Sequence, residues 1–529
     1  MKRTLIFITK LSKVFSFKEK LFITAGAVVG LIFLLAPIYF LWKTSFAQLP
    51  AQGGSLKEGL YQPINTLNPF LVSNQSEKAL LNLILEKLLV DDGQGRFSFE
   101  LAKNISVLDQ GLKYSVELKD DKIWSNKEKI TADDVTFSFQ TLKKSGQDEI
   151  RNLFTDVEVE KLDNYQVMFK LRLRDNFFLN KLSKIYIVPK STWQKFDQAE
   201  WFSAPKELLA VGSGPYRLEV FAPEKNLISF SRNPVFSPAP YIDKAIFKIY
   251  PDLQAAVEGV RLREVDSIGG LPANILKSAL SKRLKLERIV LPRVIGLFLN
   301  AKALPNVTAA QIEKYINRAK LVNEIFGGEA EPTDRLFSPT IQAYLGLAGQ
   351  STIVPQANSQ IKPLVFEQDQ IEIVTPQNYF FQSIVDHLKQ FLPLRVRAEN
   401  SDEINSTILQ NKQYQAIIFG INYDLPPNLT PFFFENSPFN LINVSNRQLT
   451  RLLQRLALEN LPAAEQQKVW QNLQQEILNT NKVVFLVNPY YLYVVPKNLR
   501  GYNLKILRQP EERFVKIETW YFRTKTKWR

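Results

Sequence analysis

The chain has 529 residues, of which 45% are hydrophobic and 22% charged, so it has the composition of a globular protein but is too long for one hydrophobic core. It contains no cysteine and one histidine, His387. This excludes disulfides, thiolate chemistry and histidine-rich metal sites, and a Ser-His-Asp triad would require His387 as its base. The net charge is +15 and its excess lies mostly near the two ends, which favours membrane lipid over nucleic acid as a partner.

An uncharged sequence of 22 residues runs from Leu21 to Trp42. A helix of that length spans roughly 33 Å, enough for the hydrocarbon core of a bilayer. Basic residues precede it, so the positive-inside rule predicts a cytoplasmic segment at 1–20, a single transmembrane anchor at 21–43, and an extracytoplasmic main domain.

The alternative is a signal peptide cleaved after Ala47, because Ser45-Phe46-Ala47 has the small-x-small pattern of a cleavage site. The apolar run exceeds the usual signal core of about 7–15 residues, which favours the anchor. The small, polar and Gly-rich residues 44–58 are then predicted to be a tether.

The rest of the chain alternates between helical and strand periodicity, which predicts a mixed α/β fold. A T-A-D-D sequence at Thr131 predicts a helix start, and Asn446 is a predicted helix cap. The predicted helices are 77–89, a helix from 131 onwards, 380–388, one following 446, and 463–478. The predicted strands are 111–119, 165–171, 371–374, 394–396, 483–487 and 491–495.

The only notable glycine-rich motif is Val211-Gly212-Ser213-Gly214-Pro215-Tyr216. A phosphate-binding loop would lead into a helix, whereas alternating residues follow Pro215, so we predict a turn before a strand. His387 lies beside the apolar face of its predicted helix and is interpreted as a structural residue. No set of residues indicates a reaction, a metal site or a cofactor, so we expect a protein that is not an enzyme.

The order of short motifs from about residue 55 to 522 resembles the family 5 extracytoplasmic solute-binding proteins of ABC importers, the oligopeptide, dipeptide and nickel-binding type. Arg263 stands where that family usually has a glycine. The motifs that carry the resemblance are Thr66–Pro69, Glu86–Asp91, Leu101-Ala102, Gly111–Tyr114, Ile123–Phe139, Val211–Leu218, Arg232-Asn233-Pro234, Tyr241-Ile242-Asp243, Glu264-Val265-Asp266 and Asn300.

The resemblance implies a type II periplasmic-binding-protein-like fold of three lobes joined by two hinges, with the ligand between the lobes. Lobe I would combine 59–94, 210–296 and 498–529. Lobe II would be 95–209 and lobe III 297–497.

The resemblance also implies candidate ligand-binding residues. Peptide-binding relatives use a third-lobe aspartate to bind the peptide amino group, and the matching position here is Asn422. A neutral amide cannot form that charge-assisted bond, so Asp424 would have to replace the aspartate. Tyr423 lies between them, and Trp124 and Phe434 are candidate aromatic walls.

The predicted function is therefore the substrate-binding component of an ABC importer, a membrane-anchored monomer that delivers a peptide or other small solute to its permease. The alternative keeps the fold but makes it an extracytoplasmic interaction or sensory module. A cytoplasmic segment of only about 20 residues argues against autonomous signalling.

Overall fold

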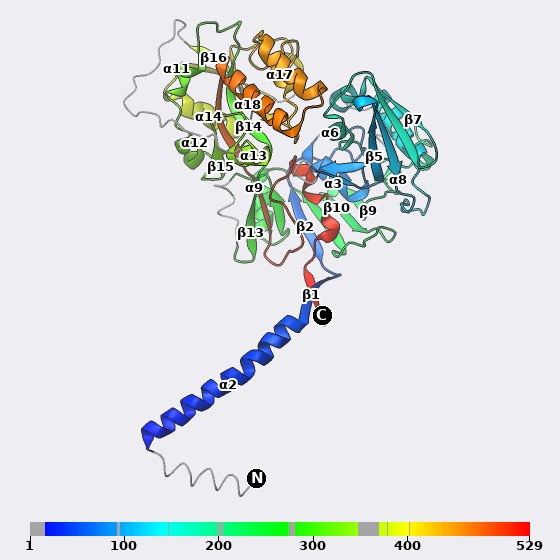
Figure 1. Ribbon diagram of the computed structural model, residues 1–529, viewed down its shortest axis with the longest axis vertical. Coiled ribbons are helices and arrows are strands. Elements are labelled where there is room, and N and C mark those ends of the chain that lie inside the picture. The colour runs from blue at the N-terminus through cyan, green and yellow to red at the C-terminus, as the bar shows by residue number, and fades with distance from the viewer. Residues whose placement is uncertain are drawn as a thin grey trace. The chain divides into compact units, whose positions relative to one another are not determined.

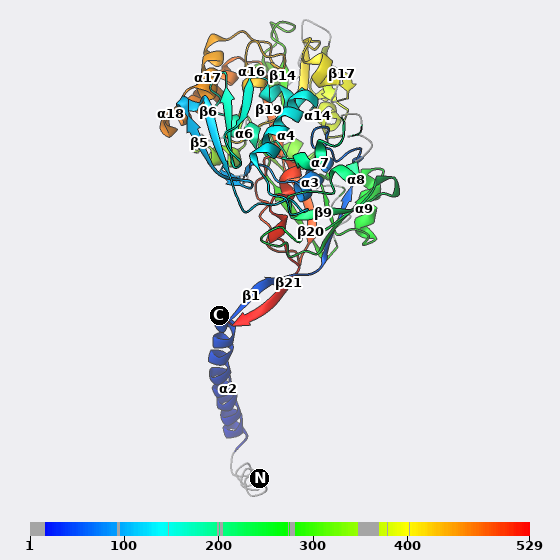
Figure 2. The same cartoon turned by 90° about the vertical axis from the view of Figure 1, so that its right-hand side faces the viewer.

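The computed structural model describes residues 16–72, 74–91, 96–145, 148–197, 200, 205–272, 275, 281–347, 370–377, 379–400 and 403–528 (Figures 1 and 2). The chain forms two units, one of residues 1–54 with 521–529 and one of residues 55–520. Most of the predicted basic segment, residues 1–15, lies outside the described residues.

The smaller unit contains one long helix and a two-stranded ribbon. Helix α2 (Phe17–Ser45) carries exposed apolar side chains, with Phe22 83% and Phe33 75% accessible. Strand β1 (Phe46–Ala51) pairs antiparallel with β21 (Arg523–Trp528), so part of the predicted tether is a paired strand. Within the described residues, no helix has an apolar stretch long enough to cross a membrane.

The larger unit contains a seven-stranded sheet whose order is β13-β20-β12-β2-β11-β10-β9. Strand β2 pairs parallel with both β11 and β12. The chain passes from β11 to β12 through helix α9 (Leu253–Arg261), whose first turn is capped by the Asp252 side chain. The strands are β2 (Ser55–Leu60), β9 (Tyr216–Ala222), β10 (Leu227–Arg232), β11 (Lys244–Ile249), β12 (Ser267–Gly269), β13 (Leu284–Ile289) and β20 (Tyr491–Pro496).

A six-stranded sheet has the order β15-β19-β14-β18-β16-β17. Alternate residues of β14 enter different cores, since Val294 and Phe298 join one hydrophobic cluster and Ile295 and Leu297 another. The sheet is therefore buried on both faces, as its apolar sequence requires. The strands are β14 (Arg293–Leu299), β15 (Ala330–Pro332), β16 (Ile371–Pro376), β17 (Leu394–Glu399), β18 (Ala416–Asn422) and β19 (Val483–Pro489).

Several helices cover the six-stranded sheet. The predicted cap of α17 is confirmed, because the Asn446 side chain accepts the Leu449 backbone N–H at 3.0 Å. The principal helices here are α11 (Ala309–Glu313), α12 (Arg318–Glu324), α13 (Pro339–Tyr344), α14 (Tyr379–Lys389), α16 (Thr430–Phe433), α17 (Arg447–Leu458) and α18 (Ala463–Asn479). His387 on α14 is 4% exposed, and burial lowers the pKa of its imidazole, consistent with the predicted structural role.

A four-stranded sheet of order β5-β6-β8-β7 packs on α4 (Ala132–Ser145) through edge-to-face aromatic rings, including Phe139 and Phe169 at 4.8 Å. The predicted start of α4 is confirmed. The prediction assigned the cap to the Thr131 hydroxyl, whereas in the structure the Asp134 carboxylate accepts the Thr131 backbone N–H. The strands are β5 (Ala102–Leu108), β6 (Lys113–Leu118), β7 (Val157–Lys161) and β8 (Gln166–Leu171), and a separate ribbon pairs β3 (Leu89–Asp91) with β4 (Phe97–Phe99).

The helix predicted at 77–89 is too long by one turn. Helix α3 (Gln75–Ile84) ends because Leu85 is extended and the Gly214 backbone N–H bonds to the Ile84 carbonyl at 2.7 Å. A Cβ on Gly214 would lie 2.6 Å from the Leu83 carbonyl oxygen, so the turn needs glycine for this close approach. The predicted turn-to-strand reading of this motif is confirmed, since β9 follows directly.

The boundaries of the three lobes remain a prediction. The sheet order does place β20 with β2 in the seven-stranded sheet, although the prediction assigned residues 491–496 to the third lobe.

Candidate functional site

The chain crosses between the seven-stranded and six-stranded sheets at two places, from β13 into β14 and from β19 into β20. The crossings are tied together, because the Arg293 guanidinium donates to the Pro489 carbonyl at 2.7 and 3.0 Å. Burial lowers the pKa of Arg293 to about 10. Two short connections therefore join the seven-stranded and six-stranded sheets at this place.

A small cavity lies at the carboxyl ends of β2 and β12, which is the edge where open α/β sheets bind ligands. Its volume is about 30 Å³, so it accommodates one water-sized group. The Tyr61 hydroxyl donates to the Gly270 carbonyl at 2.9 Å. The lining residues are Glu58–Gln62, Gln75, Ser76, Gly269, Gly270, Tyr491 and Arg513.

A buried charged cluster forms one wall of this cavity. Arg513 donates to one Glu58 oxygen at 2.7 and 3.0 Å, and the Tyr493 hydroxyl donates to the other. Burial opposes ionisation of Arg513, but the Glu58 charge outweighs it and raises the pKa of the guanidinium. The cluster is thus a fully paired internal ion pair that fixes the C-terminal segment against β2.

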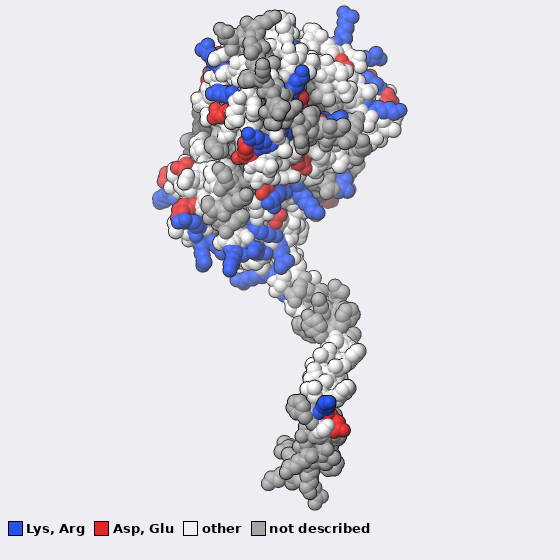
Figure 3. Space-filling view, turned by 90° about the vertical axis from the view of Figure 1, so that its left-hand side faces the viewer, with Lys and Arg blue, Asp and Glu red and all other residues white. Residues whose placement is uncertain are grey.

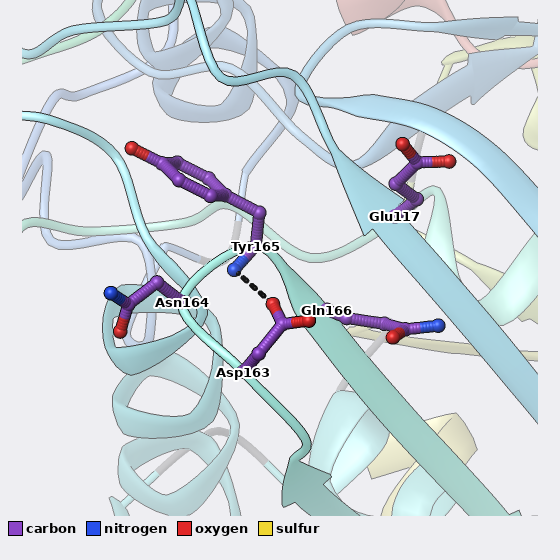
Figure 4. Close-up of a pocket in the computed structure, with 5 residues that line it drawn as sticks. All are labelled: Glu117, Asp163, Asn164, Tyr165 and Gln166. Carbon is purple, nitrogen blue, oxygen red and sulfur yellow. Dashed lines mark hydrogen bonds between the residues drawn. The ribbon is translucent and has the colours of Figure 1, made fainter.

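A larger hollow of about 430 Å³ lies at the hairpin before β8 on the four-stranded sheet (Figure 4). It is lined by Glu117 and Asp163–Gln166, and the Asp163 carboxylate accepts the Tyr165 backbone N–H at 2.6 Å. The Asp163 carboxylate thus satisfies a backbone N–H of the turn, and the polar groups of the hollow do not point to a common place where a substrate could react. Across the described residues, no group of three or more His, Cys, Asp or Glu side chains is placed to hold a metal ion.

Two of the predicted site residues lie at the end of β18, beside the crossing from β13 into β14. Asn422 is exposed. Tyr423 is 2% exposed, donates its backbone N–H to the Pro292 carbonyl, and packs edge-on against Phe337. Its hydroxyl has no hydrogen-bond partner among the described residues, and burial raises the pKa of its phenol.

Asp424 is paired inside the protein. Its carboxylate lies 2.9 Å from the Lys184 ammonium and 3.7 Å from the Arg508 guanidinium. Burial acts to raise the pKa of Asp424, but Lys184 and Arg508 outweigh burial and lower it. The carboxylate is therefore ionised and already has two cationic partners.

The two predicted aromatic walls lie in different surroundings. Trp124 is 1% exposed, and its indole N–H faces the Asp134 carboxylate at 3.3 Å, next to the start of α4. Phe434 is partly exposed at the end of α16 and packs against the core that includes Tyr423. Whether either side chain contacts a ligand stays a prediction.

Sequence reasoning missed a segment that joins the four-stranded part to the six-stranded part. The backbone and side-chain N–H groups of Asn176 donate to Leu456, Ala457 and Glu459 carbonyls at the end of α17, at 2.7–2.9 Å. Nearby, Phe177 belongs to the same core cluster as Phe337, and α6 (Phe178–Leu182) contributes Asn180, which donates to the Leu425 carbonyl. We call residues 176–184 the bridging segment; no local motif marks it.

Comparison with known proteins gives consistent results. The family model described as "Bacterial extracellular solute-binding proteins, family 5 Middle" matches residues 97–438. The chain is 26% identical to the oligopeptide-binding protein AppA of Bacillus subtilis over 300 residues. That alignment covers 53% of each protein, so it spans about half the length of this curated relative.

Solved structures extend the likeness of fold over nearly the whole chain. AppA of B. subtilis in complex with a nonapeptide has a TM-score of 0.69 at 20% identity and covers 89% of this chain and 99% of its own. NikZ of Campylobacter jejuni in complex with Ni(L-His) has a TM-score of 0.66 at 19% identity and covers 88% and 99%. Because the family model covers more than half of the sequence, the chain belongs to family 5 of the bacterial extracellular solute-binding proteins.

Proposed function

We propose that this protein binds a peptide or other small solute between its lobes and delivers it to the permease of an ABC importer. The observation that carries the proposal is the pair of chain crossings next to the carboxyl edge of the seven-stranded sheet, in a chain of family 5. Movement about two short crossings can open and close a cleft around a solute. No catalytic role is proposed.

The ligand class is proposed only broadly, because similar structures carry different ligands. AppA is described with a nonapeptide and NikZ with Ni(L-His). In this chain Asn422 carries no charge, and Asp424 has Lys184 and Arg508 as partners. The candidate contacts remain Asn422, Tyr423, Asp424, Trp124 and Phe434, with Tyr423 supported by its unpartnered hydroxyl among the described residues.

We also propose that the N-terminal region anchors the protein to the membrane, with the main domain outside the cytoplasm. The support is the uncharged sequence from Leu21 to Trp42 and the basic residues before it. An anchor would keep the solute-binding domain close to its permease.

A direct test is native mass spectrometry and thermal unfolding of the purified full chain, first alone and then with a mixed peptide pool. A ligand at about 100 times its dissociation constant should stabilise the folded state by about 2.7 kcal/mol. A bound peptide or a concentration-dependent shift in melting temperature is expected. No bound species and no shift with peptides, sugars or metal chelates would instead favour the interaction-module alternative.

A further inference from the structure

A band of positive charge lies at the edge of the seven-stranded sheet opposite the cavity. On the face drawn in Figure 3, Lys and Arg side chains gather along the lower edge of the larger unit. Five exposed cations define what we call the basic edge, and none forms an ion pair with another described residue. They are Lys57, Arg263, Lys282, Lys497 and Arg500.

Strand pairing brings these residues together. Leu284 pairs with Pro496, so Lys282 and Lys497 lie just beyond the same end of β13 and β20, where the Lys497 backbone N–H bonds to the Arg283 carbonyl. Lys57 is next to this end, since its carbonyl accepts the Asp266 backbone N–H. The Arg283 side chain ties the end of α9 to the same edge through Asp266 at 2.6 Å and the Val260 carbonyl.

The acidic groups around this edge are already neutralised by other cations. Asp266 pairs with Arg283, Glu264 with Lys248, and Glu258 with Arg261. Among the described residues, the five cations of the basic edge therefore have no acidic partner that compensates their charge. An apolar side chain is exposed among them, because Leu262 is 62% accessible and lies between two arginines.

Both ends of the larger unit lie at this same edge. Ser55 begins β2 beside Lys57, and near the other end Thr519 donates to the Gly501 carbonyl at 2.8 Å while the Trp520 ring packs on Tyr502. The chain continues from Ser55 backwards through β1 to helix α2. If residues 21–43 are the membrane anchor proposed above, the basic edge is the part of the larger unit with the shortest chain connection to the bilayer.

We propose that the basic edge binds anionic lipid headgroups. Clustered Lys and Arg near a bilayer are attracted to its negative surface potential, and an exposed leucine flanked by arginines suits the headgroup boundary. Contact at this edge leaves the opposite, carboxyl edge of the sheet free for solute. The charge and exposure of the basic edge support this binding by themselves. The proposed anchor adds only that the bilayer is near.

The test is hydrogen exchange of the full chain in nanodiscs of phosphatidylcholine alone or with phosphatidylglycerol. Anionic lipid should slow exchange of peptides from 281–286 and 496–502 by at least about threefold, and about 1 M salt should abolish the effect because screening shortens to about 3 Å. Equal exchange in both lipids would overturn the proposal. If the chain does not enter nanodiscs, the anchor fails, and the same comparison with added vesicles still decides the lipid contact.

Charge reversal supplies the matched control. The variant Lys282→Glu, Lys497→Glu and Arg500→Glu should lose the lipid-dependent protection. Arg447→Glu, Arg451→Glu and Lys468→Glu change the net charge equally and should retain the protection. These three residues are exposed on α17 and α18, and none of the three has an ion pair with another described residue. If both variants lose protection, only net charge matters and the edge has no special role. If the first variant misfolds, the loss of protection at high salt in the unmodified protein still tests whether the lipid contact is electrostatic.

Discussion

At the scale of single residues, Asp424 connects three distant parts of the chain. Lys184 belongs to the bridging segment, Asp424 follows β18, and Arg508 lies in the C-terminal segment, where it also donates to Glu512 and Ser183. Each partner satisfies a charge that would otherwise be costly to bury. The junction therefore holds together segments that sequence order places far apart.

Replacing Asp424 by Asn should lower the free energy of unfolding by about 2 kcal/mol, the usual range for a lost charge-assisted hydrogen bond. Urea unfolding at neutral pH measures this. Lys184→Met should cost a comparable amount, and the double variant less than the sum, because both changes remove the same pair. Strictly additive losses would show that the two side chains do not interact in solution.

The Asp424 contribution has a defined pH dependence. Since the folded protein lowers the pKa of this carboxyl, its stabilisation is present above the ordinary value of about 4 and is lost as the pH falls through the folded value. The difference in stability between the unmodified protein and Asp424→Asn should therefore shrink under strongly acidic conditions. A difference that stays constant down to about pH 2 contradicts the ion pair.

Glu86 should show the opposite behaviour. It is 5% exposed, and burial together with the Glu100 charge raises its pKa to about 7 although Lys122 lies 2.5 Å away. Between about pH 4.5 and 7 the unfolded chain loses this proton first, so stability falls as the pH rises. The stability of Glu86→Gln should therefore rise relative to the unmodified protein as the pH increases across that interval. Chemical unfolding at several pH values tests this, and a flat difference would contradict it.

At the scale of elements, the packing of the Gly212–Gly214 turn on α3 gives a sharp prediction. Gly214→Ala places a Cβ 2.6 Å from backbone atoms of Leu83 and Ile84, which cannot move without shifting the helix. Overpacking of this kind should cost about 1–3 kcal/mol. Gly420→Ala in β18 is the control, because its nearest neighbour would be a Phe381 side-chain atom at 3.5 Å. Equal melting temperatures for the two variants would contradict the close approach.

Helices and strands with strong periodicity were predicted well, and their ends less well. Helix α17 begins where Asn446 predicts it because a cap acts on its own first turn. Helix α3 stops one turn early because a turn more than 120 residues later bonds to its last carbonyl. Such a contact has no local signal.

At the scale of the whole molecule, the bridging segment holds the four-stranded part against α17 by direct bonds between protein groups. Asn176→Ala removes two side-chain donors from the C-terminal carbonyls of α17. If the proposed lobes close around a solute, this variant should favour their open arrangement by about 1–2 kcal/mol and weaken solute binding by about 5–30-fold.

Small-angle scattering of the Asn176→Ala variant should show a larger radius of gyration than the unmodified protein, and titration calorimetry should show the weaker affinity. Asn152→Ala serves as the control, because Asn152 is exposed in the short segment Asn152–Phe154 before β7. Unchanged scattering and affinity in Asn176→Ala would mean that the bridging segment does not influence closure.

The sequence by itself determined the family, the α/β class and most of the regular elements, because periodicity, helix caps and turn glycines act over a few neighbouring residues. It also identified the β18 end as a region of interest, although ligand contact by Asn422, Tyr423, Asp424, Trp124 and Phe434 stays untested.

Only the tertiary structure decided which charges meet. The pairing of Asp424 with Lys184 and Arg508 and the assembly of the basic edge join residues separated by tens or hundreds of positions. Those pairings depend on strand order and on how the sheets are connected. Local propensity has no information about either, so these features become visible only once the chain is folded.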